Sequence, residues 1–205
     1  MLRMLNQVLE RNSLMLRIPQ NHHRGKRCFI VASGPSIKEM DLSLLRGEIV
    51  ICVNESYKAF PYDPTYICIG DRELWPRVKD IYATKRSKLI CSTGLNGQVG
   101  SDYSGTNLFA RVPLNKEKTI LTHGFTYQLD KELYKAWNVI PELALPFACW
   151  CGFSECYLLG CDCTNDGYFY SDPARGVEWQ FIHEHTMDCY QSIARRFLLP
   201  TKILN

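Results

Sequence analysis

The stretch CFIVASGPSIKEMDLSLL (residues 28–45) decides the fold class of this chain. Its apolar run, residues 28–32, meets the polar turn Ser-Gly-Pro-Ser at residues 33–36, and leucines at helical spacing follow the turn. A short apolar run bounded by turn residues indicates a buried strand, and the later periodicity indicates a helix. The sequence therefore predicts a strand that ends in a tight turn and passes into a helix.

Comparable apolar runs recur along the chain and alternate with helical or irregular segments. They lie at residues 27–33, 48–54, 65–71, 88–93, 155–162 and 201–205. The runs are apolar almost throughout rather than alternating, as expected for strands buried on both faces. We therefore expect an α/β, Rossmann-like fold with a mostly parallel sheet, helices on both faces and a lid-like insertion.

The length of 205 residues suits one domain of ordinary size. Residues 1–24 are expected to form an N-terminal amphipathic helix and a linker, and residues 25–205 a single α/β domain. The lid-like segment is expected at about residues 163–182. The Gly-, Ser- and Asn-rich stretch 94–126 predicts a long irregular loop.

Composition and charge exclude several functional classes. Hydrophobic residues make up 46% of the chain and charged residues 22%, which is the balance of a globular protein. A net charge of +3, without a run of Lys or Arg, argues against nucleic acid as a partner. No apolar stretch is long enough to span a bilayer, and no signal peptide is predicted. The N-terminal helix leaves peripheral membrane contact open, and the sequence does not give the oligomeric state.

The chain contains ten cysteines, which raises the question of disulfides. Five of them lie inside the apolar runs, where a free cysteine behaves as a small hydrophobe: Cys28, Cys52, Cys68, Cys91 and Cys156. This placement favours reduced thiols and a cytoplasmic location.

The residues that close the apolar runs are the candidates for chemistry, because ligands of open parallel sheets bind outside the carboxyl ends of the strands. The ends are small or polar: 33–36 (Ser-Gly-Pro-Ser), 54–56 (Asn-Glu-Ser), 70–72 (Gly-Asp-Arg) and 160–162 (Gly-Cys-Asp). Packing alone also predicts turn residues at such places. Four such ends together predict one shared pocket.

The first turn carries features of an anion site. Gly34 allows close backbone approach, Pro35 fixes φ, and Ser36 can cap the following helix. Exposed amides at a helix N-terminus favour a phosphate. The chain lacks both G-x-G-x-x-G and G-x-x-x-x-G-K-[ST], so neither dinucleotide fingerprint nor P-loop is present. On the basis of the helix N-terminus, a nucleotide phosphate is still the expected ligand of the domain at residues 25–205. A plain turn without a ligand is the alternative.

The stretch FIHEHTMDCYQSIARRF (residues 181–197) supplies a second candidate site. His183 and His185 are two residues apart, which on a helix would aim them at different faces, so the spacing favours a loop just before a helix. A histidine there can act as a general acid or base, and a capping or surface histidine is the alternative. The nearby pairs Cys149-x-Cys151 and Cys161-x-Cys163 are spaced too closely for an ordinary zinc site, so no metal site is predicted.

Three blocks carry a resemblance to known families: FIVASGPSIKEMDLSLL, ICVNESYKAF and GFSECYLLGCDCTNDGYFYSD. They resemble the bacterial sialyltransferases that use CMP-sialic acid. They also resemble the related superfamily of flagellin-modifying glycosyltransferases and 6-hydroxymethylpterin diphosphokinase MptE-like proteins. Ser33 stands where the sialyltransferases have Asn, and Asp71 where they tend to place Asn, so the resemblance leaves the donor open.

The resemblance implies roles for single residues. The first turn would approach the nucleotide phosphate and ribose, Asn54 would hydrogen-bond the nucleotide or sugar, and Asp162 would lie beside the base. Tyr168 and Tyr170 would contact the leaving phosphate. The nucleotide-binding residues expected on these grounds are Ser33, Gly34, Pro35, Ser36, Asn54, Asp71, Gly160, Asp162, Tyr168 and Tyr170.

The resemblance also implies an activity. His183, with His185 as the second choice, would be the general base of a glycosyltransferase that moves a sialic-acid-like sugar from a donor such as CMP-sialic acid to a hydroxyl of a glycan or another acceptor. No cofactor would be required beyond the donor. One alternative is an MptE-like diphosphokinase in which Asp71 and Asp162 hold Mg²⁺ against ATP. The other is a nucleotide-binding domain without catalysis.

Overall fold

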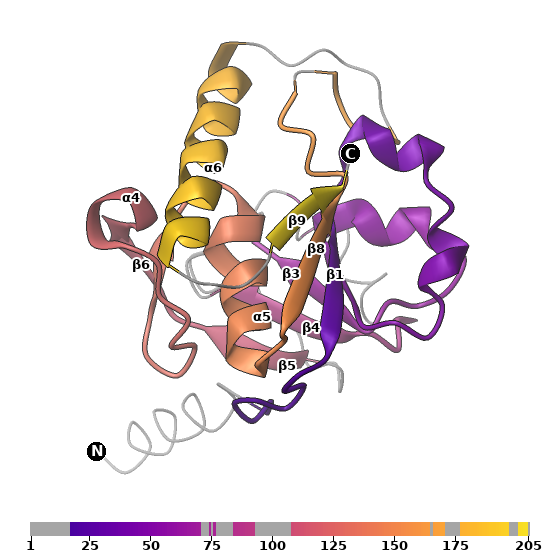
Figure 1. Ribbon diagram of the computed structural model, residues 1–205, viewed down its shortest axis with the longest axis horizontal. Coiled ribbons are helices and arrows are strands. Elements are labelled where there is room, and N and C mark those ends of the chain that lie inside the picture. Colours follow the sequence, from indigo (N-terminus) through magenta and orange to yellow (C-terminus); the bar gives the residue numbers. More distant parts are fainter. Residues whose placement is uncertain are drawn as a thin grey trace.

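The computed structural model describes residues 17–70, 74, 76, 84–92, 108–164, 166–170, 177–196 and 201–204. In this part of the chain, seven parallel strands form one sheet in the order β5-β4-β3-β2-β1-β8-β9 (Figure 1). The strands are β1 (Arg27–Val31), β2 (Val50–Val53), β3 (Tyr66–Ile69), β4 (Lys88–Ser92), β5 (Leu108–Val112), β8 (Glu155–Leu159) and β9 (Thr201–Leu204). The predicted Rossmann-like parallel sheet is confirmed.

The apolar runs become central strands because both of their faces are buried. Along β1, Cys28 and Ile30 pack into the hydrophobic cluster on one side of the sheet, whereas Val31 packs into the cluster on the other side. All residues of β2 and β3 are buried in the same way. Cysteine fits these positions because it is small and apolar, and the five cysteines expected in strands are buried there as thiols.

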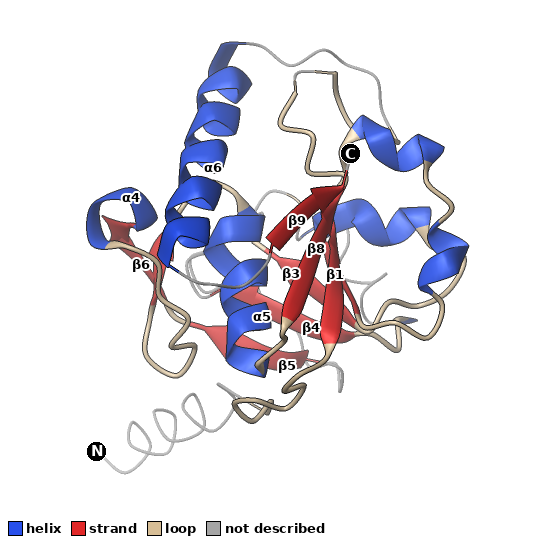
Figure 2. Cartoon of the chain, viewed as in Figure 1, coloured by secondary structure: helices blue, strands red, loops and turns tan. Residues whose placement is uncertain are grey.

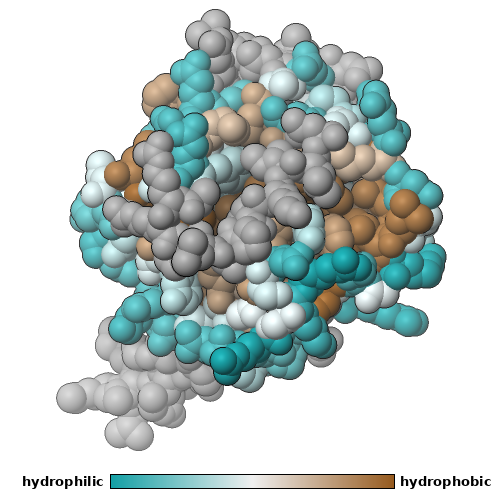
Figure 3. Space-filling model, in the orientation of Figure 1, coloured by the Kyte–Doolittle hydropathy of each residue, from teal (hydrophilic) through white to brown (hydrophobic). Residues whose placement is uncertain are grey.

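Helices cover both faces of the sheet (Figure 2). One face packs against the π-helix η4 (Ile140–Ala144), α5 (Leu145–Cys151) and α6 (Val177–Arg196). The other face packs against three short 3₁₀ helices, η1 (Pro35–Glu39), η2 (Leu42–Leu45) and η3 (Asn54–Ala59). The single helix predicted after the first turn is therefore a pair of 3₁₀ helices. Hydrophobic residues reach the surface on this side, at the right of Figure 3, and Leu44 is 79% exposed.

The long irregular loop predicted over residues 94–126 is wrong for its second half. Residues 93–107 lie outside the described part, but β5 is followed by β6 (Leu114–Thr119) and the short helix α4 (Ile120–His123). Strand β6 pairs with β7 (Leu133–Lys135) in a separate two-stranded sheet. Strand β6 is half-buried or exposed and most of its residues are polar. It therefore lacks the continuous apolar pattern of the central strands.

The described N-terminal segment is attached to the domain. Ile18 is buried, and its carbonyl oxygen accepts a hydrogen bond from Trp150 Nε1 (3.0 Å). The Asn21 N–H donates to the carbonyl oxygen of Trp150 (2.8 Å). The predicted helix at the start of the chain lies outside the described residues. Within the described part, no helix is both long and apolar enough to cross a membrane.

Candidate functional site

The topology creates a crevice next to β1. The chain proceeds from β1 through β2 to β5 on one side, whereas β8 and β9 lie on the other, so the strand order reverses between β1 and β8. Open parallel sheets bind ligands at such a switch point, outside the carboxyl ends of the strands. A cavity of about 720 Å³ opens there, a size ordinary for a small-molecule site.

Most of the residues expected from the sequence line this cavity. They are Ser33, Gly34, Pro35, Asn54, Gly160, Asp162, Tyr168, Tyr170 and His183. Ser36 and His185 are not among the lining residues, and Asp71 lies outside the described residues. The ends of β1, β2 and β8 thus share one cavity.

The first turn packs directly on the end of β8. The Gly34 N–H donates to the carbonyl oxygen of Gly160 (2.9 Å). A Cβ at Gly34 would lie 2.5 Å from that oxygen and 2.7 Å from Asp162 Cγ. A glycine is required here because of this close approach, while its φ of −63° is accessible to any residue.

Asp162 occupies the anion position that the sequence assigned to a phosphate. Its Oδ2 accepts the Ser36 N–H (2.8 Å), and its Oδ1 accepts the Ser36 hydroxyl (2.5 Å). A side-chain carboxylate therefore satisfies the Ser36 amide in the first turn of η1. The expectation that Ser36 caps the helix is wrong, because its N–H and its hydroxyl both donate to Asp162. A phosphate over this turn stays a prediction.

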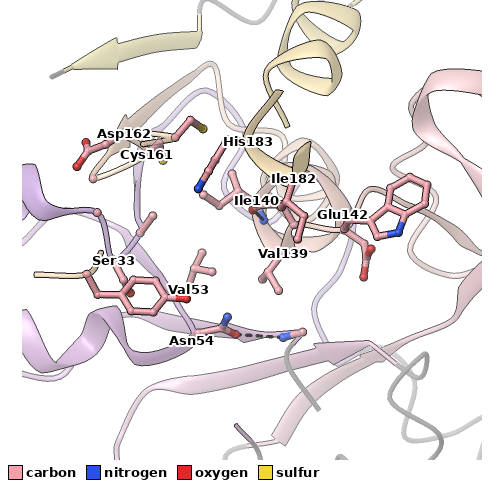
Figure 4. A pocket seen from close by; sticks show the side chains of 18 of the residues that line it. Ser33, Val53, Asn54, Val139, Ile140, Glu142, Cys161, Asp162, Ile182 and His183 are labelled. Carbon is pink, nitrogen blue, oxygen red and sulfur yellow. Dashed lines mark hydrogen bonds between the residues drawn. The ribbon is translucent and has the colours of Figure 1, made fainter. Parts of the chain in front are cut away.

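Asn54 links the ends of β2 and β3. Its Oδ1 accepts the Gly70 N–H at 3.3 Å, drawn as the dashed line in Figure 4. Its φ is +51°, a left-handed conformation that Asn tolerates better than most residues. The side chain thus has a structural partner as well as a place on the cavity wall.

The segment around Tyr168 and Tyr170 is docked on the first turn. The Phe169 N–H donates to the Ser33 carbonyl oxygen (3.0 Å), and the rings of Tyr168 and Tyr170 stack with their centroids 5.0 Å apart. The Lys58 ammonium lies 4.9 Å from the centre of the Tyr170 ring. Residues 177–182 belong to helix α6, so the lid-like segment predicted to reach residue 182 ends earlier.

His183 and His185 lie on a helix, and the loop predicted for them is wrong. Both belong to α6, where a spacing of two residues directs them to different faces. His183 lines the cavity. The His185 ring instead meets the indole of Trp137 edge to face, with centroids 4.4 Å apart, and stacks with Phe181 at 5.7 Å.

Sequence reasoning missed the wall formed by the segment between β6 and α5. Glu142, Lys116, Lys135 and Trp137 line the cavity on that side. Glu142 is buried, its Oε2 accepts the Ala136 N–H (3.0 Å), and burial raises the pKa of its carboxyl above the ordinary value. The available signal was a single carboxylate in the apolar run VIPELALPF, since an acidic residue is rarely buried without a partner.

The cavity wall carries charges of both signs. Its three described carboxylates already have partners: Asp162 binds Ser36, Glu142 binds Ala136, and Glu55 binds Lys58 at 2.5 Å. Two lysines, Lys116 and Lys135, add positive charge to the wall. Within the described part of the chain, no group of three or more His, Cys, Asp or Glu is arranged to hold a metal ion.

The cysteines of the cavity are poor nucleophiles. Burial raises the pKa of Cys161 well above its ordinary value and raises the pKa of Cys163 to about 11. A thiol must ionise to attack, so neither residue is activated near neutral pH. Among the described residues that line the cavity, His183 is the one histidine.

Fold and site together define a Rossmann-like α/β domain with a cavity of mixed polar and apolar lining at its switch point. The chain belongs to the family described as 6-hydroxymethylpterin diphosphokinase MptE-like, which matches residues 1–167. Comparison with curated proteins gives no match.

Among solved structures, the MAf glycosyltransferase from Magnetospirillum magneticum AMB-1 is similar, with a TM-score of 0.59 and 16% identity. The match covers 95% of this chain and 37% of that protein, so this chain spans well under half of its length. The family match agrees with the superfamily that the sequence motifs indicated, and the structural match agrees with the Rossmann-like fold.

Proposed function

We propose that this protein is a glycosyltransferase that moves a sugar from a nucleotide donor to a hydroxyl acceptor. The observation that carries the proposal is the position of His183, which lines the same cavity as the ends of β1, β2 and β8. The general fold of a solved glycosyltransferase supports it as well. A histidine beside a nucleotide-sized cavity suits acid–base chemistry at neutral pH.

In this proposal the donor nucleotide lies over the first turn, near Gly34 and Asn54. The Tyr168 and Tyr170 hydroxyls donate to oxygens of the departing phosphate. Asp162 is held by Ser36 at the edge of the cavity, where its remaining acceptor capacity can receive a hydrogen bond from the base or ribose. We favour a CMP-linked donor with an acidic, sialic-acid-like sugar, since the motif resemblance favours it.

The reaction proceeds as a displacement. His183 takes the proton of the acceptor hydroxyl as its oxygen attacks the anomeric carbon of the donor. The bond between that carbon and the phosphate oxygen breaks, and the nucleotide leaves with the electron pair. The tyrosine hydroxyls stabilise the charge that develops on the phosphate. This scheme uses protein side chains alone for proton transfer and charge stabilisation.

A nucleotide binding screen tests the proposal. Calorimetric titrations with CMP, CDP, UDP and ATP, each with and without Mg²⁺, should give the tightest binding for a pyrimidine nucleotide, independent of Mg²⁺. Asn54→Ala should weaken that binding by about 1–3 kcal/mol, because a buried hydrogen-bond partner is lost. Binding of ATP alone, and only with Mg²⁺, would contradict the transferase.

The family description favours one second candidate, a diphosphokinase that uses ATP. Oxygen ligands are what Mg²⁺ requires, and the candidates expected from the sequence are Asp71 and Asp162. Asp162 is already engaged with Ser36, which counts against this role. The same titrations separate the two candidates, and no nucleotide binding at all would remove both, together with a purely nucleotide-binding role.

A further inference from the structure

Trp137 has an unusual backbone conformation on the wall of the cavity. It follows β7 and precedes η4, its φ is +56°, and the residue is 39% exposed. A bulky side chain seldom adopts a left-handed φ, because its Cβ crowds the backbone. Such strain persists where surrounding contacts impose it, and it concentrates at functional sites.

Three side chains hold this conformation. Glu142 reaches back from η4 and accepts the Ala136 N–H, with a further backbone hydrogen bond from Trp137. The Lys135 ammonium lies 4.4 Å from the centre of the indole ring. His185 of α6 contacts the same indole edge to face. The ring thus contacts side chains of β7 and α6, η4 holds the backbone beside it, and Trp137 lines the cavity.

The indole lies toward the end of the cavity away from the first turn, over which the nucleotide is proposed to bind. Figure 4 shows Asp162 on one side of the cavity, Glu142 on the other, and His183 between them. Trp137 follows directly on Ala136, the residue that Glu142 binds. A group bound against Trp137 would therefore meet the proposed base from the side opposite the first turn.

We propose that Trp137 forms the acceptor subsite and recognises a neutral sugar ring, with Glu142 as the residue that positions it. This inference rests on the glycosyltransferase proposed above. One face of a hexose exposes polarised C–H groups, which pack on the electron-rich face of an indole. Lys116, Lys135 and Asn138 line the cavity nearby and supply hydrogen-bond partners for the hydroxyls at the ring edge.

Direct sugar binding tests the subsite without requiring turnover. Saturation-transfer NMR with methyl glucoside, methyl galactoside and methyl N-acetylglucosaminide, each with and without CMP, should detect binding of at least one sugar. Trp137→Ala should weaken that binding about tenfold, and Trp137→Phe should restore most of it. Phe181→Ala is the matched control, because Phe181, like Trp137, contacts the His185 ring but does not line the cavity. This variant should bind sugar normally.

Glu142 is tested by comparing two substitutions. Glu142→Gln keeps an oxygen for the Ala136 N–H and should retain sugar binding, whereas Glu142→Leu removes it and should reproduce the loss seen in Trp137→Ala. CMP affinity should be unchanged in all these variants.

Two results would overturn the subsite: no sugar bound by the wild-type protein, or equal binding by Trp137→Ala. If the wild-type protein did not bind CMP, the proposed donor would be wrong. The sugar measurements without nucleotide would still decide the subsite.

Discussion

Asp162 accepts hydrogen bonds from both the N–H and the hydroxyl of Ser36, a residue 126 positions earlier in the sequence. This pair fastens the end of β8 to the first turn after β1, on the two sides of the point where the strand order reverses. The carboxylate therefore fixes the shape of the cavity mouth. It also fills the helix terminus that a phosphate would otherwise use.

Removal of this cap should destabilise the domain. Asp162→Ala leaves two donors of Ser36 without their acceptor, which should lower the free energy of unfolding by about 1–3 kcal/mol. Urea denaturation measures the change. Asp41→Ala is the matched control, since Asp41 caps Ser43 by the same two bonds at an exposed site and should cost less. Equal losses in the two variants would show that the Asp162 cap stabilises the fold no more than an exposed cap does.

The close packing of the first turn predicts a strong effect at Gly34. In Gly34→Ala the new Cβ would collide with the Gly160 carbonyl and the Asp162 carboxyl, so both stability and nucleotide affinity should fall. Gly47→Ala provides the contrast, because its Cβ would enter open space and only its φ of +91° resists substitution, at a cost of about 1–2 kcal/mol. A Gly34→Ala protein that binds nucleotide normally would argue against a ligand over this turn.

His23 should make stability depend on pH. Its Nε2 is 2.7 Å from the Tyr66 hydroxyl oxygen, and burial, reinforced by neighbouring positive groups, lowers its pKa from 6.5 to about 4. The unfolded chain then binds the proton more readily than the folded one, so stability is full above about pH 6.5 and declines as the pH falls towards 4. Urea midpoints at pH 7 and pH 5 measure this decline. His23→Asn should reduce the decline strongly, and His22→Asn only slightly, since His22 is one of the neighbouring positive groups. An undiminished decline in His23→Asn would assign the effect to other groups.

The strands and the shared cavity could be predicted because burial leaves a direct trace in the sequence. Runs such as Val50–Val53 are apolar at every position since both faces of the sheet are covered, and the polar residues that end them fall at one edge of a parallel sheet. This reasoning located Gly34, Asn54 and Asp162 on the cavity. It could not reveal that Asp162 binds Ser36, because that contact depends on the placement of β8 beside β1.

The opposite wall of the cavity left no comparable trace. Strand β6 is half-exposed and polar, so its sequence resembles a loop. The left-handed φ of Trp137 results from tertiary contacts with Glu142 and His185 rather than from local preference. His183 was predicted for a loop because helical positions two apart diverge, and in the structure that divergence separates it from His185.

The rate of nucleotide release in His183→Ala and His185→Ala tests the central claim most directly. The substrate is the nucleotide sugar whose nucleotide binds best, with water as the acceptor, and CMP release from CMP-sialic acid is the first choice. A general base contributes about 100- to 10,000-fold to rate, so His183→Ala should lose activity by that factor while its CMP affinity stays within about twofold. His185→Ala should retain most of the wild-type rate, since its ring faces Trp137 and not the cavity. Unchanged release in His183→Ala, or loss in His185→Ala alone, would contradict the role of His183 and the mechanism built on it.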